Sequence, residues 1–315
     1  MSGTEPDRAP IAVAGATGYI GGKLTRELLE RGERVRALAR SPERASDLAD
    51  AGAELVQADV LEPGALPEAL EGVSTAYYLV HSMGRGSSGD FAESDKTGAR
   101  NFAAAARTAG VDLIVYLGGL SEGGSKHLAS RHETAEVLRE AGVPVTYLRA
   151  AAVIGAGSES FRTVFYLVKR LPLMVTPRWV GTRTQPIGIA DVVRYLADVP
   201  ATPEARGRDI EIGGPDVTTY GGMMDDMARA MGRNPRPRIG VPMLSPGLSS
   251  LWIGLVTPVD AGVARPLIHG LEVETIVRDP SGMGLFDFEP MSIRDAMEAA
   301  VAEMDGRPEA GAPSS

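Results

Sequence analysis

The 315-residue sequence contains no cysteine. Disulfide bonds, catalysis by a thiolate and metal sites built from cysteine are therefore excluded. Excess positive charge is also absent, because 32 Lys and Arg residues face 41 Asp and Glu residues and leave a net charge of −9. Nonspecific nucleic-acid binding needs an excess of basic residues that face the phosphates. We therefore expect a small-molecule substrate and no nucleic-acid partner.

Long uninterrupted apolar runs are missing as well. Residues 1–10 are polar and lack the apolar core of a secretory signal. The most apolar later stretch, residues 248–264, is interrupted by Pro258 and Asp260, whereas a membrane-spanning helix needs about 20 apolar residues in succession. We expect a cytoplasmic protein with no stable membrane insertion, and the apolar residues 248–259 leave peripheral membrane contact open.

A glycine-rich turn follows the first apolar run and precedes a segment with apolar residues at helical spacing. From position 15 it reads Gly-Ala-Thr-Gly-Tyr-Ile-Gly. In such a turn the first glycine allows a tight bend, the second lets the backbone approach a phosphate, and the third lets the helix pack on the strand. The helix N-terminus adds positive potential for a pyrophosphate. The predicted dinucleotide-binding residues of this turn are Gly15, Thr17, Gly18, Tyr19, Ile20 and Gly21.

Short apolar runs alternate with helix-like segments as far as residue 149. The six runs are residues 11–14, 35–39, 54–58, 76–80, 113–117 and 145–148. Strands joined by helical crossovers form a doubly wound parallel sheet. We therefore expect an α/β fold of the Rossmann type over residues 11–156.

Frequent prolines loosen the pattern after residue 155 and indicate a smaller, loop-rich substrate lobe. We assign residues 157–184 and 214–305 to this C-terminal lobe, and we expect residues 185–213 to return to the dinucleotide-binding domain. Within them, residues 210–212 read as a strand, and residues 223–231 read as an amphipathic helix. The polar ends, residues 1–10 and 306–315, are expected to be disordered tails.

Several segments resemble the extended and atypical short-chain dehydrogenase/reductase superfamily. The glycine turn, the second strand with the Arg-Ser-Pro that ends it, and Ala58-Asp59-Val60 carry the general resemblance. Residues 115–120, 132–138 and 142–149 resemble NmrA-like members, and residues 185–193 and 210–220 resemble epimerase-like members. The resemblance covers about residues 11–231 and implies a Rossmann domain with a small C-terminal substrate lobe.

One part of the superfamily pattern is absent. Active members use a Tyr four residues before a Lys to protonate the substrate oxygen, and a Ser or Thr after the fifth strand orients the carbonyl. Here Leu128 and His132 align with the Tyr and the Lys, and Gly118 and Gly119 stand at the usual serine positions. The literal Tyr-x-x-x-Lys string that begins at Tyr19 lies inside the cofactor turn, and we interpret it as a coincidence.

The end of the second strand indicates which dinucleotide is bound. Folds that prefer NAD place an acidic residue there, which accepts hydrogen bonds from the ribose hydroxyls. This sequence has Arg40, whose charge suits the 2′-phosphate of NADP, and Ser41 and Arg44 offer further donors. We therefore expect NADP(H) to be preferred over NAD(H), with a solvated surface arginine as the alternative. The resemblance places Asp59 and Val60 near the adenine.

Candidates for proton transfer follow from position alone. His81 and Ser82 come directly after the fourth strand, where they would face the nicotinamide, and His81 would serve as a general acid as well as a cofactor contact. His132 is the expected stand-in for the missing donor, and alternatively Arg131 or His132 binds the nicotinamide ribose or an anionic substrate. No metal site is expected, because His127 and His132 are five residues apart rather than four.

The resulting hypothesis is an NADP(H)-dependent oxidoreductase that acts on a small carbonyl-type substrate without the usual Tyr-Lys pair. One alternative is a noncatalytic NADP(H)-binding regulatory or assembly protein of the NmrA-like group, which would have a protein partner. A second alternative is a nucleotide-sugar epimerase-like enzyme.

Overall fold

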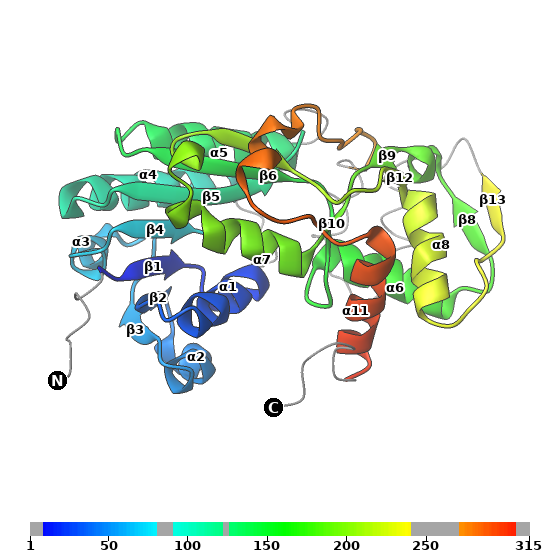
Figure 1. Cartoon of the computed structure of the whole chain (residues 1–315), viewed down its shortest axis with the longest axis horizontal. Coiled ribbons are helices and arrows are strands. Elements are labelled where there is room, and N and C mark those ends of the chain that lie inside the picture. The colour runs from blue at the N-terminus through cyan, green and yellow to red at the C-terminus, as the bar shows by residue number, and fades with distance from the viewer. Residues whose placement is uncertain (1–8, 81–90, 122–125, 241–270, 307–315) are drawn as a thin grey trace.

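The computed structural model describes residues 9–80, 91–121, 126–240 and 271–306. Its centre is a seven-stranded sheet in the order β11-β6-β5-β4-β1-β2-β3, and every neighbouring pair in it is parallel (Figure 1). The strands are β1 (Ile11–Ala14), β2 (Val35–Ala39), β3 (Glu54–Gln57), β4 (Thr75–Tyr78), β5 (Leu113–Gly119), β6 (Val145–Ala150) and β11 (Asp209–Ile212). The predicted doubly wound Rossmann sheet is therefore confirmed. The seventh strand, β11, comes from the run at residues 210–212.

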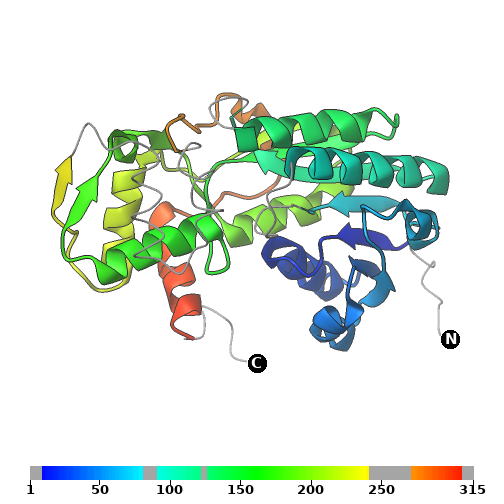
Figure 2. The ribbon, with the colours of Figure 1, turned by 180° about the vertical axis from the view of Figure 1, so that it is seen from behind.

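Helices cover both faces of this sheet, as Figures 1 and 2 show from opposite sides. One face carries α1 (Tyr19–Glu30), α2 (Ser46–Asp50) and α7 (Ile189–Asp198), and the other carries α3 (Leu66–Ala69), α4 (Phe91–Ala109) and α5 (Lys126–Arg139). Tyr77 and Tyr78 show why both faces are apolar. Side chains alternate along a strand, so Tyr77 lies in the core beside α1 and α7 while Tyr78 lies in the core beside α4, and both are buried.

A third core lies beyond the carboxyl ends of the strands. It is formed by α6 (Glu159–Arg170), α8 (Tyr220–Ala230) and α11 (Ile293–Met304). Met223, Met224 and Met227 are buried in it, so the methionines of this helix act as core residues. Helix α8 begins three residues before the predicted start because Thr219 caps it: its hydroxyl accepts a hydrogen bond from the Gly222 amide at 3.0 Å.

Short strand pairs and 3₁₀ turns complete the described structure. The pairs are β7 (Val153–Ile154) with β10 (Ile187–Gly188), β9 (Arg183–Thr184) with β12 (Thr218–Thr219), and β8 (Met174–Thr176) with β13 (Arg238–Gly240). The 3₁₀ turns are η1 (Pro42–Ala45), η2 (Pro63–Ala65), η3 (Arg178–Gly181), η4 (Val199–Ala201), η5 (Pro203–Ala205) and η6 (Pro280–Leu285). Over the described ranges, no helix has the length and apolar character that crossing a bilayer requires.

Candidate functional site

A cavity of about 840 Å³ runs along the carboxyl ends of the central strands. It extends from the end of β2, across the glycine turn, to the ends of β5 and β6, and then to α8. In an open α/β sheet, ligands bind in the crevice outside these strand ends. The cavity is therefore in the place where the fold binds a dinucleotide.

The glycine turn has no room for side chains at two of its positions. Gly15 has φ +90°, and a Cβ atom added there would lie 2.6 Å from the Leu79 carbonyl oxygen. A Cβ atom at Gly21 would collide with the carbonyl of Gly15. The amide of Gly18 donates to the Gly15 carbonyl at 2.9 Å and thereby closes the turn directly before α1. All six predicted residues of the turn line the cavity.

The start of α1 supplies the electrostatics at this turn. The first amides of a helix have no partner within the helix, and the helix dipole makes this end positive. Gly18 precedes the helix without a side-chain cap, and no acidic residue lies in the first turn. These features fit a pyrophosphate group, because an anion would receive the amide hydrogen bonds without a competing carboxylate.

One end of the cavity is lined by Arg40, Ser41, Arg44, Asp59 and Val60, the residues that the sequence analysis predicts for the adenosine side. Arg40 and Arg44 are exposed, and within the described residues neither forms an ion pair. The Asp59 carboxylate accepts a hydrogen bond from the Leu61 amide at 2.9 Å. The two arginines are therefore available for an anionic group, while Asp59 is held by its own loop.

At the other end, the cavity passes Gly118, Gly119 and Leu120 after β5. The ring of Tyr147 fills the space beside Gly118, since an added Cβ atom would lie 2.6 Å from ring carbon Cε2. Burial raises the pKa of Tyr147 to about 12, and its neutral hydroxyl donates to the Gly119 carbonyl at 3.5 Å. The absence of a serine at this position therefore has a steric cause.

Helix α5 presents Arg131, and not His132, to the cavity. Neighbouring helical residues point about 100° apart, and the imidazole of His132 instead faces Tyr147, with ring centroids 6.4 Å apart. Its Nδ1 is buried and, among the described atoms, has no hydrogen-bond partner. Alignment with the superfamily's Lys position predicted His132, but it does not show which side chain of α5 faces the cavity. The side chain of Leu128, and both His81 and Ser82, lie outside the described residues.

Tyr19 has a structural partner that the sequence did not reveal. Its ring lies against Gly157, where a Cβ atom would collide with it, and its hydroxyl donates to Glu303 Oε2 of α11 at 3.1 Å. Burial raises the pKa of Tyr19, and Lys23 forms an ion pair with Glu303 at 3.2 Å. The literal Tyr-x-x-x-Lys string therefore joins α1 to α11 through one carboxylate.

The far end of the cavity contains hydroxyl groups that sequence reasoning missed. Tyr220, at the start of α8, and Thr275 both line it, and the Thr275 hydroxyl lies 2.8 Å from that of Thr184. Burial raises the pKa of Tyr220, while hydrogen bonds with these two threonines act in the opposite direction. No spacing in the sequence connects residues 184, 220 and 275; only the tertiary structure brings them together.

Three comparisons agree with this geometry. Residues 15–165 match the model of an NAD(P)H-binding family. A ceramide reductase from Caulobacter vibrioides is 27% identical over 271 residues, which are 83% of this chain and 85% of that protein. A photosystem II assembly factor from Trieres chinensis is 24% identical over 210 residues, or 65% of this chain and 63% of the factor.

The fold is also found in solved structures. An NADPH-dependent quinone oxidoreductase from Escherichia coli, complexed with NADPH, superposes with a TM-score of 0.74 at 21% identity and covers 91% of this chain and 98% of its own. At this identity the likeness concerns the fold. Together, the family model over residues 15–165 and this likeness show that the chain contains an NAD(P)H-binding domain with the Rossmann fold.

Proposed function

We propose that the protein is an NADP(H)-dependent oxidoreductase that transfers a hydride to or from a small carbonyl-type substrate. The observation that carries this proposal is one continuous cavity, which extends from the arginines after β2 to the hydroxyl groups of Tyr220 and Thr275. Such a cavity can hold a dinucleotide along the strand ends and leaves space for a second molecule beyond it. Two of the proteins compared above are named as reductases or oxidoreductases, which supports hydride transfer.

The preference for NADP(H) rests on Arg40 and Arg44. A guanidinium group binds a phosphate through paired, charge-assisted hydrogen bonds, whereas the ribose hydroxyls of NAD call for a carboxylate. Ser41 adds a hydroxyl donor on the same loop. The acidic residue that lines the same end of the cavity, Asp59, already accepts a hydrogen bond from the Leu61 amide.

We assign roles at the nicotinamide end to residues that line the cavity or are predicted to lie beside it. Bound NADPH would supply the hydride, and the ends of β5 and β6 would orient its ring. Arg131 is the cavity residue of α5 that would bind the nicotinamide ribose or an anionic substrate. His81 remains a predicted proton donor, whereas His132, which faces Tyr147 and does not line the cavity, is not assigned this role. We assign residues 157–184 and 214–305 to the substrate lobe, where Tyr220 and Thr275 would contact the substrate oxygen.

A fluorescence titration of the purified protein with NADPH and NADH tests the cofactor assignment. We expect NADPH to bind more tightly, and we expect Arg40→Ala to weaken NADPH binding roughly tenfold or more while leaving NADH nearly unchanged, because a charged hydrogen bond contributes about 1.5–3 kcal/mol. Arg107→Ala is the matched control, since Arg107 is exposed at the end of α4 and does not line the cavity. Equal affinities for the two dinucleotides would contradict the proposal.

A noncatalytic NADP(H)-binding protein is the second candidate. The observation that favours it is the Tyr147 ring, which fills the place of the usual catalytic serine beside Gly118. The similarity to an assembly factor supports the same reading. Oxidation of bound NADPH by any member of a panel of quinones, enones and aldehydes would favour the enzyme. Tight NADPH binding with no turnover across that panel would favour the noncatalytic protein.

A further inference from the structure

The end of the molecule farthest from β3 differs in charge from the rest of the chain. Residues 161–176 and 229–239 contain seven Lys or Arg and no Asp or Glu, in a chain whose net charge is −9. These segments lie side by side, because β8 pairs with β13 and the Met174 amide donates to the Pro237 carbonyl at 3.0 Å. Figures 1 and 2 show this strand pair at the outer edge of the molecule.

Six basic side chains make up this basic end. They are Lys169, Arg170, Arg229, Arg233, Arg236 and Arg238. Two of them pair with carboxylates of α8: Arg229 with Asp226 at 2.7 Å, and Arg238 with Asp225 at 2.6 Å. The basic end therefore keeps a net positive charge after these pairs are counted.

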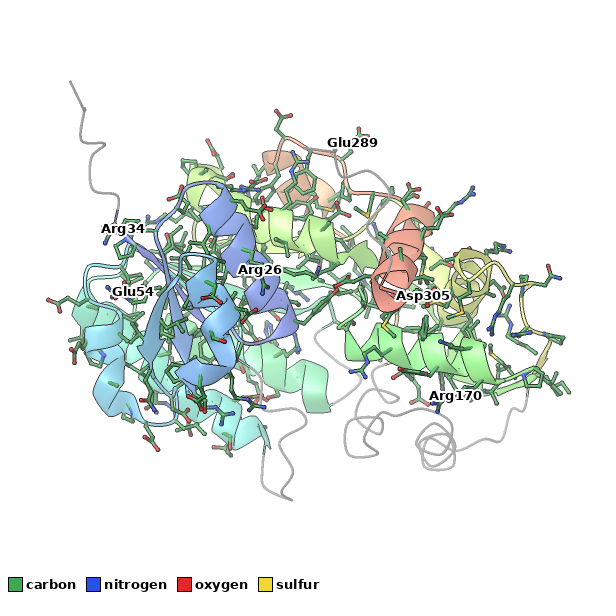
Figure 3. All side chains as sticks on the ribbon, turned by 90° about the horizontal axis from the view of Figure 1, so that it is seen from below. Arg26, Arg34, Glu54, Arg170, Glu289 and Asp305 are labelled. Atoms are coloured by element: carbon green, nitrogen blue, oxygen red, sulfur yellow. The ribbon has the colours of Figure 1, made fainter. Side chains whose placement is uncertain are left out.

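Two further arginines of the basic end donate hydrogen bonds to backbone carbonyls. Arg233 Nη1 donates to the Lys169 carbonyl at 2.9 Å, and Arg236 Nε donates to the Val168 carbonyl at 3.4 Å. Lys169 and Arg170 lie over aromatic rings of α6, each 5.0 Å from the ring centroid. The carbonyls and the Phe165 ring orient Arg233, Arg236 and Lys169 without neutralising their charges. Figure 3 shows Arg170 on α6, on the side of the molecule away from Arg34 and Glu54.

Two large apolar side chains are exposed in the same pair of segments. Leu173, directly before β8, is 43% exposed, and Ile239, in β13, is 53% exposed. Among the described residues, the other exposed large apolar side chains are Leu61 and Val217. The basic end thus combines two exposed apolar side chains with several basic side chains.

We propose that the basic end docks the protein on the surface of an anionic lipid bilayer. Cations attract acidic headgroups and apolar side chains enter the headgroup boundary, and stable peripheral binding needs two such signals together. The exposed apolar pair favours a bilayer over a nucleic acid, which would bind the charge alone. Helix α8 runs from the cavity at Tyr220 to Ala230 at the basic end, a rise of about 15 Å. Docking would therefore bring the far end of the cavity close to the membrane.

Vesicle co-sedimentation of the full chain tests this inference. We expect binding to equimolar phosphatidylcholine–phosphatidylglycerol vesicles, with little binding to phosphatidylcholine alone, and loss of binding at high salt. Replacing both arginines in Arg233→Gln/Arg236→Gln should lower the partition coefficient roughly tenfold or more, because each basic residue near the surface contributes to the attraction. Leu173→Ser/Ile239→Ser should also weaken binding at low salt.

The matched control is Arg26→Gln/Arg294→Gln, which removes two exposed arginines outside the basic end and should bind vesicles as the wild type does. Retained NADPH affinity in every variant shows that each is folded. The inference is overturned by equal binding to both vesicle types, by no binding to either, or by equal losses in the control. Binding to duplex DNA but not to vesicles would reassign the surface to nucleic acid. The vesicle result does not depend on whether the protein oxidises NADPH.

Discussion

At Gly118 the sheet has no room for a side chain, because the ring of Tyr147 occupies the space that a Cβ atom would need. That ring is fixed by stacking on Tyr116, with centroids 5.1 Å apart, and it is 1% exposed. One buried aromatic residue thus excludes a side chain at position 118, and with it a serine hydroxyl.

Gly118→Ser should destabilise the protein. The added atoms would force Tyr147 out of its packed position, and overpacking of this kind costs about 1–3 kcal/mol. Urea denaturation measures the loss. Gly64→Ser is the control, because nothing lies within 4 Å of a Cβ atom at that position, and we expect its free energy of unfolding to stay within about 0.5 kcal/mol of the wild type. Equal effects of the two changes would show that the space beside Gly118 is not filled.

Asp191 provides a prediction about pH. Its carboxylate is buried and accepts the Met291 amide at 3.1 Å, and burial raises its pKa above the ordinary 3.8. The folded state therefore holds the proton more tightly than the unfolded state does. The penalty for ionising Asp191 is absent well below pH 3.8, grows as the pH rises, and is constant above the folded pKa.

Asp191→Asn removes this penalty and keeps an oxygen that accepts the Met291 amide. We therefore expect the free energy of unfolding of the variant, minus that of the wild type, to increase from pH 4 towards neutral pH and then to level off. Denaturation curves for both proteins at several pH values give this difference. A difference that falls with rising pH would mean that the folded pKa is lowered and not raised.

Among the elements, β11 lies at one edge of the sheet and contacts residues that are far from it in the sequence. Glu211 in β11 accepts the amides of Arg278 and Asp279 at 2.6 and 3.0 Å and lies 3.7 Å from Arg149 of β6. Arg149 in turn donates to the Leu120 carbonyl, beyond β5, at 2.9 Å. This network covers the edge strand with residues 278–279 and connects it to the cavity wall.

Glu211→Gln should cost about 1–3 kcal/mol of stability, because it removes a partly buried charge that accepts two amides and faces an arginine. Glu298→Gln is the control. Glu298 pairs with Arg294 at 3.0 Å, but their side chains are 53% and 82% exposed, so its loss should cost less than about 0.5 kcal/mol. Urea denaturation compares the two variants. The network has no special role if both lose the same stability.

Over the whole molecule, the cavity couples stability to the cofactor. Its walls come from the sheet, from α1, from α5 and from α8, so a ligand that fills it binds the folded chain and not the unfolded one. At a free concentration one hundred times its dissociation constant, such a ligand adds about 2.7 kcal/mol to the free energy of unfolding.

We expect NADPH to raise the urea midpoint of the wild type, and NADH at the same concentration to raise it less. Arg40→Ala should remove most of the difference between the two cofactors, because the arginine is proposed to bind the 2′-phosphate. Chemical denaturation with each cofactor makes the comparison. A larger shift with NADH would contradict the assignment of Arg40.

The sequence by itself determined the Rossmann sheet and the glycine turn, for a local physical reason. The positive φ of Gly15 and the close contact between Gly21 and the Gly15 carbonyl exclude side chains at both positions. Glycine is therefore required there, and apolar runs of strand length before and after the turn are visible in the sequence. The six predicted strands follow from patterns of this range, and Arg40 and Asp59 line the cavity while their contacts with a cofactor remain predictions.

Only the tertiary structure decided which side chains meet at long range. The choice between Arg131 and His132 depends on the rotation of α5, and the hydroxyl cluster joins residues from three separate segments. The basic end likewise forms because β8 pairs with β13 across more than sixty residues of chain. Local sequence patterns do not predict such contacts. These contacts arise from how the helices and strands pack, and not from the spacing of residues along the chain.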